Sequence, residues 1–334
     1  QALDREKDLL WEPVQVALRI AQLCKQINPD NILVDHVSFG STLGVYATGR
    51  RFTTLVPGHP SQLPVGKERY GIPATWPACM QPEPNALIDQ EDITDRVTKT
   101  FTDRWNAALA IIAPTMSPVK DAFRVHGNQV LYNSSSHYHP FERSPHLPIH
   151  HEFIGPLVRD EELAKPFQQW LAQEPEKPLV YVALGTFLSH RADVLSNIAI
   201  ALQQADVRVA MAIGASPMTA FESLPVGWLI APSLPQVALL GECDLVIHHG
   251  GNNSVQEALA LGVRQIILPF STDQFANAAD LERTGQATVI SPNHICATSF
   301  AQVVKVTLTL PEPKPIMAQS CATLARILRT PIEA

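Results

Sequence analysis

Short apolar runs and amphipathic stretches alternate along most of the chain. Apolar residues at helical spacing predict helices over residues 13–28 and 40–48. In the first half, brief apolar runs predict buried strands at 31–34, 52–56, 108–113 and 129–132. In the second half, strands are expected at 179–184, 207–213, 244–248, 265–269 and 287–290, with helical stretches between them. This alternation is typical of an α/β protein with parallel sheets covered by helices on both faces.

Two stretches interrupt the alternation. Residues 57–95 are rich in proline and poor in periodicity, which predicts long loops. Residues 158–178 are charged and contain proline, which predicts a linker between domains. We therefore expect a first domain over 1–157 and a second over 179–334.

Composition narrows the class of protein. A chain of 334 residues can form two domains, and 46% hydrophobic with 17% charged residues is globular rather than disordered. A net charge of −7 argues against a nucleic-acid partner, which needs clustered Lys and Arg. The five cysteines are scattered and show no metal-binding spacing, which indicates reduced thiols and a cytoplasmic protein. No apolar run approaches the ~20 residues of a membrane span.

The segment 244–274 concentrates the candidate chemistry. The apolar run 245–247 predicts a strand, and the glycine pair 250–251 allows a sharp turn that brings the backbone close to a ligand. Asn253 and Ser254 are favourable N-cap residues for a following helix, whose first turn presents free N–H groups and a positive dipole end. Strand, glycine turn and helix start in this order form a site for phosphate, to which His249 can add a hydrogen bond or a positive charge.

A purely structural interpretation is also available. Ser254 and Glu257 have the spacing of a capping box, in which both side chains only satisfy helix-end donors. Thr272 or Asp273 can likewise cap a helix that continues from Gln274. These interpretations explain less well why so many polar and glycine residues gather at one strand end.

The pattern resembles a known family. The residues that carry the likeness are His249, Gly251, Asn253, Ser254, Glu257, Gly262, Pro269, Asp273 and Gln274. Their order is similar to the donor-binding signature of the UDP-glycosyltransferases (glycosyltransferase family 1), in the bacterial macrolide and antibiotic branch. The resemblance implies the GT-B fold, with two Rossmann-like domains facing a cleft. The domain over 1–157 would bind the acceptor, and the domain over 179–334 the nucleotide-sugar donor.

The resemblance also implies roles for the residues of the signature. His249 would contact the diphosphate, whose oxygens would be held by the backbone around Gly251, Asn253 and Ser254. Thr186, in the turn after the strand 179–184, would lie near the same diphosphate.

The rest of the donor would be held by residues on both sides of that turn. Glu257 would accept the ribose hydroxyls, while Asp273 and Gln274 would bind the sugar. The segment 233–236 matches the part of the family that holds the nucleobase, so Leu234 and Gln236 are candidate base and ribose contacts. Ser233 stands where the family usually has a base-stacking Trp, which leaves UDP and dTDP both open.

The N-terminal half departs from the family pattern. Family members open with a strand and a glycine-histidine loop that carries the general base, whereas the first strand found here, at 31–34, is similar to the fourth. The N-terminal domain is therefore expected to be incomplete. Asp35 matches the aspartate that orients the base, and the less favoured alternative is a strand-end carboxylate that only caps the next turn. His36 and His59 are candidate substitutes for the base, but each is expected to lie in a loop or at the surface.

The hypothesis is an inverting, metal-independent glycosyltransferase without a cofactor, acting as a monomer or homodimer. It would move glucose or another hexose from a UDP- or dTDP-sugar to a hydroxyl of a small apolar acceptor such as a natural product, with little or no transfer if these residues are the whole protein. Alternatives are a noncatalytic nucleotide-sugar-binding helper and a GT-B nucleotide-sugar epimerase. A loop cluster of histidines could chelate a metal, but exposed loop residues are the preferred interpretation: His137, His139, His146, His150 and His151.

Overall fold

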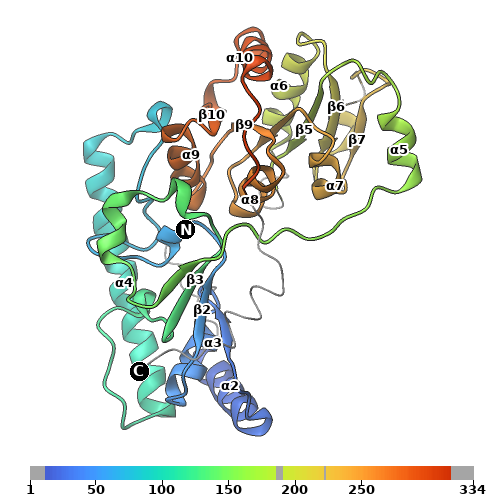
Figure 1. Ribbon diagram of the computed structural model, residues 1–334. Helices are drawn as coiled ribbons and strands as arrows, with labels where there is room; N and C mark the ends of the chain where they lie inside the picture. Colours follow the sequence, from blue (N-terminus) through green and yellow to red (C-terminus); the bar gives the residue numbers. More distant parts are fainter. Residues whose placement is uncertain (1–11, 186–190, 222, 317–334) are drawn as a thin grey trace. The chain divides into compact units, whose positions relative to one another are not determined.

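The computed structural model describes residues 12–185, 191–221 and 223–316 (Figure 1). These residues fall into two compact units. The first unit contains residues up to 74 together with 82–155, and the second contains 75–81 together with 156–316. Each unit is an α/β structure with a parallel sheet, as the alternating pattern predicts.

In the first unit, the described residues form a four-stranded sheet in the order β1-β2-β3-β4, with every neighbouring pair parallel. Its strands are β1 (Leu33–Asp35), β2 (Thr53–Val56), β3 (Gln129–Tyr132) and β4 (His151–Phe153). Its α-helices are α2 (Pro13–Ile27), α3 (Phe39–Ala47) and α4 (Pro84–Ile112). Short 3-10 helices complete it: η1 (Pro60–Gln62), η3 (Ala122–Arg124), η4 (Ser136–Tyr138) and η5 (Phe141–His146).

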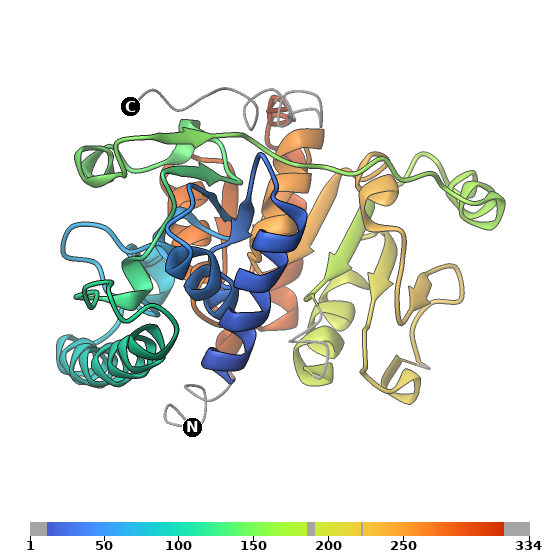
Figure 2. The same cartoon turned by 90° about the horizontal axis from the view of Figure 1, so that it is seen from below.

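Helix α4 corrects two sequence predictions. It occupies residues 108–113 up to Ile112, where a strand was expected, and it begins at Pro84 inside the stretch expected to be loops. Figure 1 shows it running along the unit, and Figure 2 shows it nearly end-on. Phe101, Trp105 and Leu109 recur every four residues and are buried among aromatic neighbours, so a helical face explains the apolar run better than a strand.

In the second unit, the described residues form a six-stranded parallel sheet in the order β10-β9-β8-β5-β6-β7. Its strands are β5 (Leu179–Ala183), β6 (Arg208–Ala212), β7 (Leu229–Ala231), β8 (Leu245–His248), β9 (Arg264–Ile267) and β10 (Ala287–Val289). Its helices are α5 (Lys165–Leu171), α6 (Ala192–Leu202), α7 (Gln236–Leu240), α8 (Asn252–Leu261), α9 (Asp273–Arg283) and α10 (Ala297–Thr309), with η2 (Ala78–Met80), η6 (Met218–Phe221) and η7 (Pro292–His294). In this doubly wound order, the direction of winding reverses between β5 and β8.

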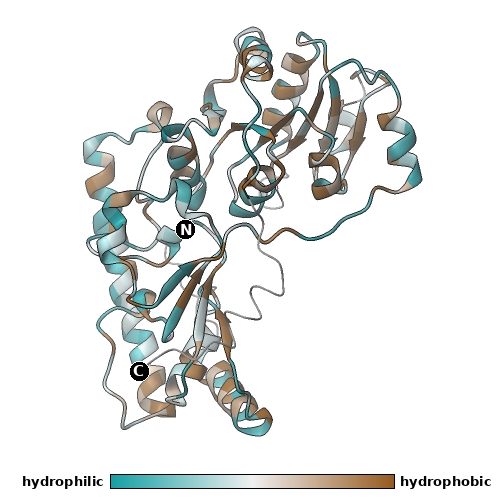
Figure 3. Cartoon of the chain, viewed as in Figure 1, coloured by the Kyte–Doolittle hydropathy of each residue, from teal (hydrophilic) through white to brown (hydrophobic). Residues whose placement is uncertain are grey.

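The central strand β5 is buried on both faces. Val180 and Val182 point into an apolar cluster shared with α6 and α10, whereas Leu179 and Tyr181 point into a second cluster shared with α7 and α8. Figure 3 shows the central strands of this sheet as largely hydrophobic. The alternation explains why the run 179–183 is apolar throughout, as in other parallel strands covered on both sides.

Two strands escaped prediction, and both lie at sheet edges. β4 has the sequence His-Glu-Phe, which is not an apolar run, and β7 is a partly buried strand of only three residues, Leu-Ile-Ala. The stretch 158–178, predicted as a linker, contains α5, whose Trp170 packs against the core of the second unit. The segment 75–81, assigned to the first half by sequence, packs with the second unit.

Candidate nucleotide-sugar site

His249 lies at the point where the winding of the second sheet reverses. It follows β8 directly, and its ring contacts Gly185, which follows the neighbouring strand β5. A Cβ atom added to Gly185 would lie 2.6 Å from His249 Cε1, and one added to Gly251 would lie 2.4 Å from His249 Nε2. The imidazole is therefore held between two glycines that approach it more closely than any other residue could. Ligands of doubly wound sheets bind at this position.

The two histidines at the end of β8, His248 and His249, differ in their hydrogen bonding. His248 is fully buried; its Nε2 lies 3.0 Å from Gln265 Oε1, and its Nδ1 accepts a hydrogen bond from Gly250 N at 3.1 Å. It therefore braces the glycine turn. Burial lowers the pKa of His249 to about 4, and its buried Nδ1 makes no hydrogen bond within the described part of the chain. The ring is thus neutral near pH 7 and offers a hydrogen bond rather than the positive charge considered from sequence.

Helix α8 begins differently from the prediction. Its N-cap is Gly251, and no side chain at that position makes a capping hydrogen bond. Asn253 and Ser254, predicted as N-caps, instead lie within the helix, where Asn253 is exposed. Because the close contact with the His249 ring requires glycine at this position, the N-cap cannot carry a side chain. This packing requirement outweighs the preference of Asn253 and Ser254 for the N-cap. The first turn of α8 therefore directs backbone donors and the positive dipole end toward the glycine turn.

Glu257 belongs to a polar cluster that links α7 and α8. Gln236 Nε2 donates to Glu257 Oε2 at 2.5 Å and to Ser254 Oγ at 3.3 Å, while Tyr181 Oη donates to Gln236 Oε1 at 3.4 Å. Glu257 is thus engaged with Gln236, contrary to the capping-box alternative. Burial raises the pKa of its carboxyl, although the Gln236 amide opposes that effect. The structure brings three predicted donor-binding residues together here.

Two more predicted donor residues, Asp273 and Gln274, stand in the first turn of α9. Gln274 Oε1 accepts hydrogen bonds from Phe270 N at 2.9 Å and Ser271 N at 3.2 Å, so its carbonyl oxygen braces the loop. Asp273 opens the helix and accepts from Thr272 Oγ1 at 3.0 Å. Thr272 itself has a φ of 47°, a strained backbone for a β-branched residue, and strain of this kind gathers at functional sites.

The glycine turn and α9 are joined directly. Asn277 Nδ2 donates to Gly250 O at 3.0 Å, and a Cβ atom on Gly250 would lie 3.2 Å from Gln274 O.

The last two predicted donor residues do not join this site in the described structure. Leu234 is buried in the core beneath α7, and Thr186 lies outside the described residues. Sequence reasoning missed Gly185 and Tyr181. Both stand in the strand-and-turn segment 179–185, where a glycine and a hydroxyl-bearing side chain within an apolar run were the available signal.

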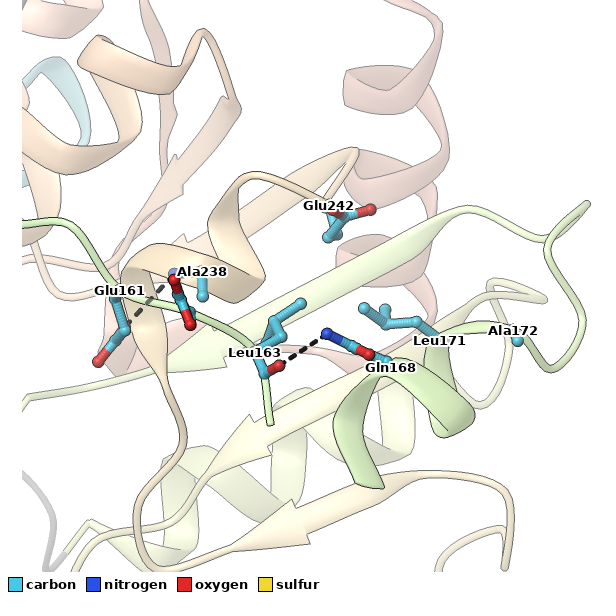
Figure 4. Close-up of a pocket in the computed structure, with 8 residues that line it drawn as sticks. Glu161, Leu163, Gln168, Leu171, Ala172, Ala238 and Glu242 are labelled. Atoms are coloured by element: carbon cyan, nitrogen blue, oxygen red, sulfur yellow. Dashed lines mark hydrogen bonds between the residues drawn. The ribbon is translucent and has the colours of Figure 1, made fainter. Parts of the chain in front are cut away.

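A separate cavity of about 630 Å³ lies beside α5 and α7. It is drawn in Figure 4 and is lined by Glu161, Glu162, Leu163, Gln168, Leu171, Ala172, Ala238 and Glu242. Three carboxylates would repel a diphosphate, so this cavity does not suit the donor. Glu161 has a structural role, because its Oε2 accepts from Val237 N at 2.8 Å and Ala238 N at 3.3 Å, which holds the start of α7 and hence Gln236.

The candidate catalytic residues of the first unit lie at the ends of β1 and β2. Asp35 Oδ1 accepts a hydrogen bond from Val37 N at 2.9 Å, the turn-capping arrangement considered as its alternative role. His36 and His59 both lie in connecting segments after strands, as expected, but each is only 1% exposed, so neither is a surface histidine. His36 Nε2 lies 2.9 Å from Gln62 O, and burial lowers its pKa to about 4. His59 Nδ1 accepts from Ser61 N at 3.1 Å.

The histidine-rich loop does not gather into a metal centre. No group of three or more His, Cys, Asp or Glu side chains within the described ranges is placed to hold a metal ion. His137, His146, His150 and His151 are exposed, whereas His139 packs at 4.8 Å from the Phe153 ring. Within the same ranges, no helix is both long and apolar enough to cross a bilayer.

The amino-acid sequence is similar to those of characterised glycosyltransferases. A relative from Mycobacterium tuberculosis, described as a PGL/p-HBAD biosynthesis glycosyltransferase, is 29% identical over 163 residues, covering 49% of this chain and 37% of that protein. The aclacinomycin-T 2-deoxy-L-fucose transferase of Streptomyces galilaeus is 26% identical over 319 residues, covering 92% of this chain and 64% of that protein. The chain thus spans about a third to two thirds of the length of these relatives.

Solved structures show the same fold. The glycotransferase of kitacinnamycin superposes with a TM-score of 0.72 at 16% identity, covering 93% of this chain and 76% of that chain. Glycosyltransferase VinC, solved in complex with dTDP, superposes with a TM-score of 0.60 at 20% identity, covering 92% of this chain and 72% of that chain. The architecture is therefore GT-B, as expected from the sequence.

A family model described as UDP-glucoronosyl and UDP-glucosyl transferase matches residues 93–322. The match contains the part of α4 from residue 93 onward, the whole second sheet and every predicted donor-binding residue. The chain therefore belongs to the UDP-glucoronosyl and UDP-glucosyl transferase family.

Proposed function

We propose that this protein is a glycosyltransferase that moves a hexose from a UDP- or dTDP-sugar to a hydroxyl of a small apolar acceptor, with inversion at the anomeric carbon. The first unit would bind the acceptor and the second the donor. The reaction needs no metal and no cofactor besides the donor. The four described cysteines are free thiols, in keeping with the proposed cytoplasmic location.

The observation that carries the proposal is the contact of His249 with two glycines beside the start of α8. Only there do a neutral imidazole, uncapped helix-end N–H groups and a close backbone approach converge within the described residues. A diphosphate would accept hydrogen bonds from these donors, which also stabilise the charge that develops on a departing nucleoside diphosphate. Glu257, about one helical turn further along α8, would accept ribose hydroxyls on the oxygen that Gln236 leaves open.

A second candidate is a protein that binds nucleotide-sugars without transferring them. The geometry around Asp35 favours it, because this carboxylate is engaged with Val37 N and the adjacent His36 is buried with its Nε2 against a backbone carbonyl. In this arrangement, Asp35 does not orient the imidazole next to it in the chain. Binding would then persist while acceptor-dependent release of the nucleotide is absent.

The decisive experiment is calorimetric titration of UDP, dTDP and GDP into the parent protein, His249→Ala and the matched control His150→Ala. Tight binding of one nucleotide, weakened roughly ten- to a hundredfold in His249→Ala and unchanged in His150→Ala, supports the donor site, since a hydrogen bond to a charged group contributes about 1.5–3 kcal/mol. His150 is exposed and stands in the other unit. If a folded parent protein binds none of the three nucleotides, the proposal fails.

Transfer is tested separately from binding. The parent protein is mixed with UDP-glucose or dTDP-glucose and a panel of macrolide and phenolic acceptors, and nucleotide release and glycosylated product are followed by mass spectrometry. A product whose anomeric configuration, by NMR, is opposite to that of the donor supports inversion. Nucleotide-sugar binding with no acceptor-dependent release supports the second candidate instead.

A further inference from the structure

A segment from the N-terminal half of the chain is built into the donor unit. Residues 75–81, called here the strap, pack with the second unit, whereas residues before 75 and from 82 to 155 belong to the first. The strap contains the short helix η2 and lies in the stretch where sequence predicts only loops. It is therefore a part of the first half that shares a compact unit with the predicted donor residues.

Three contacts anchor the strap on α9 and β10. The Trp76 ring packs on the Phe275 ring with centroids 4.7 Å apart. Ala78 N donates to Glu282 Oε2 at 2.8 Å, and Cys79 Sγ lies 3.9 Å from Val289 O. These contacts run from the first turn of α9 to the strand after it, so the strap follows the helix along its length.

The strap is also closed on itself. Gln81 Nε2 donates to Trp76 O at 2.8 Å and to Pro77 O at 3.2 Å. These bonds fix the backbone that carries the indole, so Trp76 is presented to α9 by a short, braced turn.

Trp76 packs next to the residues predicted to bind the sugar. Phe275 directly follows Asp273 and Gln274 in the first turn of α9, next to the strained backbone of Thr272. A strained residue persists only when its surroundings hold it in place. Here, Gln274 braces the loop by accepting a hydrogen bond from Phe270 N, and Trp76 packs on Phe275 in the first turn of α9.

We propose that Trp76 is a positioning residue for the sugar end of the donor site. By packing on Phe275, it holds the first turn of α9, and with it Asp273 and Gln274, in the geometry that distinguishes one hexose from another. This inference rests on the proposed function, because it assigns the sugar to those two residues. The nucleotide itself would be held on β8 and α8 and would not depend on Trp76.

The test compares nucleotide and nucleotide-sugar in the same protein. Dissociation constants of UDP, UDP-glucose and UDP-galactose, and of dTDP and dTDP-glucose, are measured calorimetrically for the parent protein, Trp76→Ala and Trp76→Phe. In Trp76→Ala we expect the affinity for the nucleoside diphosphate to stay within about twofold. The additional affinity contributed by the sugar should fall by about three- to tenfold, the range of a lost aromatic pair. Trp76→Phe should retain most of it.

Trp170→Ala is the matched control, because Trp170 is a half-buried tryptophan of the same unit that packs on the core from α5. It should leave both the nucleotide affinity and the sugar contribution unchanged. The inference is wrong if Trp76→Ala leaves the sugar contribution and the preference between glucose and galactose as in the parent protein. It is also wrong if the affinities for nucleotide and nucleotide-sugar fall equally. A parent protein that binds no nucleotide would instead overturn the proposed function.

Discussion

The substitution Gly251→Ala isolates the contact with His249 on which the proposed donor site depends. The new Cβ atom would lie 2.4 Å from His249 Nε2 and 2.8 Å from Cε1, which is closer than packed atoms tolerate. The ring cannot retreat toward Gly185, where it already leaves no room for a side chain. The backbone at Gly251 has φ −61° and ψ 141°, values that alanine adopts freely, so the substitution adds a steric conflict and no backbone strain.

The expected change in the free energy of unfolding combines two destabilising effects and one stabilising effect. Overpacking of this kind costs about 1–3 kcal/mol. Alanine is a poorer N-cap than glycine by about 0.5–1 kcal/mol, whereas it restricts the unfolded chain and so recovers about 0.4–1 kcal/mol. The last two effects offset each other, which leaves a loss of about 1–3 kcal/mol in the free energy of unfolding. The displaced imidazole should also weaken binding of the preferred nucleoside diphosphate by roughly ten- to a hundredfold, at about 1.5–3 kcal/mol for the lost hydrogen bond.

The assay combines urea denaturation with calorimetric titration in a double-mutant cycle. Gly251→Ala is measured alone and in the His249→Ala background, where the ring that causes the conflict is gone. There it should cost less than about 0.5 kcal/mol of stability and leave nucleotide affinity unchanged. Gly241→Ala is the control, because its Cβ atom would lie 3.5 Å from Ala238 O in a helical backbone. An equal cost of Gly251→Ala in both backgrounds would refute the steric explanation.

Three further predictions concern stability and charge. Burial raises the pKa of Glu257 in the folded protein, so the ionised carboxylate destabilises the fold above that raised pKa, and the effect vanishes below the ordinary pKa of a glutamate, where the carboxyl is protonated in both states. Glu257→Gln should therefore have a higher melting temperature than the parent protein at pH 7 and the same melting temperature near pH 4. The same variant should bind nucleotide more weakly by calorimetry. Burial lowers the pKa of three histidines: His36 and His249 to about 4 and His248 to about 3. In the unfolded chain these histidines stay protonated up to about pH 6.5, whereas in the folded protein they are already neutral above about pH 4. The free energy of unfolding, measured in urea, should therefore rise between pH 4.5 and 6.5 by about 1.4 kcal/mol per pH unit for each histidine that titrates. A flat profile would contradict this. Gly127→Ala should lose at least about 1–3 kcal/mol, because its Cβ atom would lie 2.1 Å from Phe52 O, while Gly227→Ala, with no atom within 4 Å, should stay within about 0.5 kcal/mol in the same denaturation assay.

The sequence alone was sufficient for most of the periodic elements, and it also predicted where the candidate site lies. Most strands of the second unit were predicted within a few residues, because strands buried on both faces are apolar throughout and leave a signal that needs no knowledge of their neighbours. The prediction of a ligand site at the glycine pair 250–251 and His249 rests on a related reason. A close approach of backbone to ligand requires residues without side chains, and few other residues satisfy that demand.

Tertiary structure decided what local pattern leaves ambiguous. The run 108–113 can be strand or helix by composition, and packing of α4 on the aromatic cluster of the first unit made it helix. Contact with the His249 ring required glycine at the N-cap of α8, which moved the helix start away from its best capping residues. The burial of His36, the pairing of Gln236 with Glu257 and the docking of Trp76 on Phe275 each join residues that sequence spacing does not relate. Such contacts exist only once the chain has folded, because they depend on which elements lie side by side rather than on the order in which they occur.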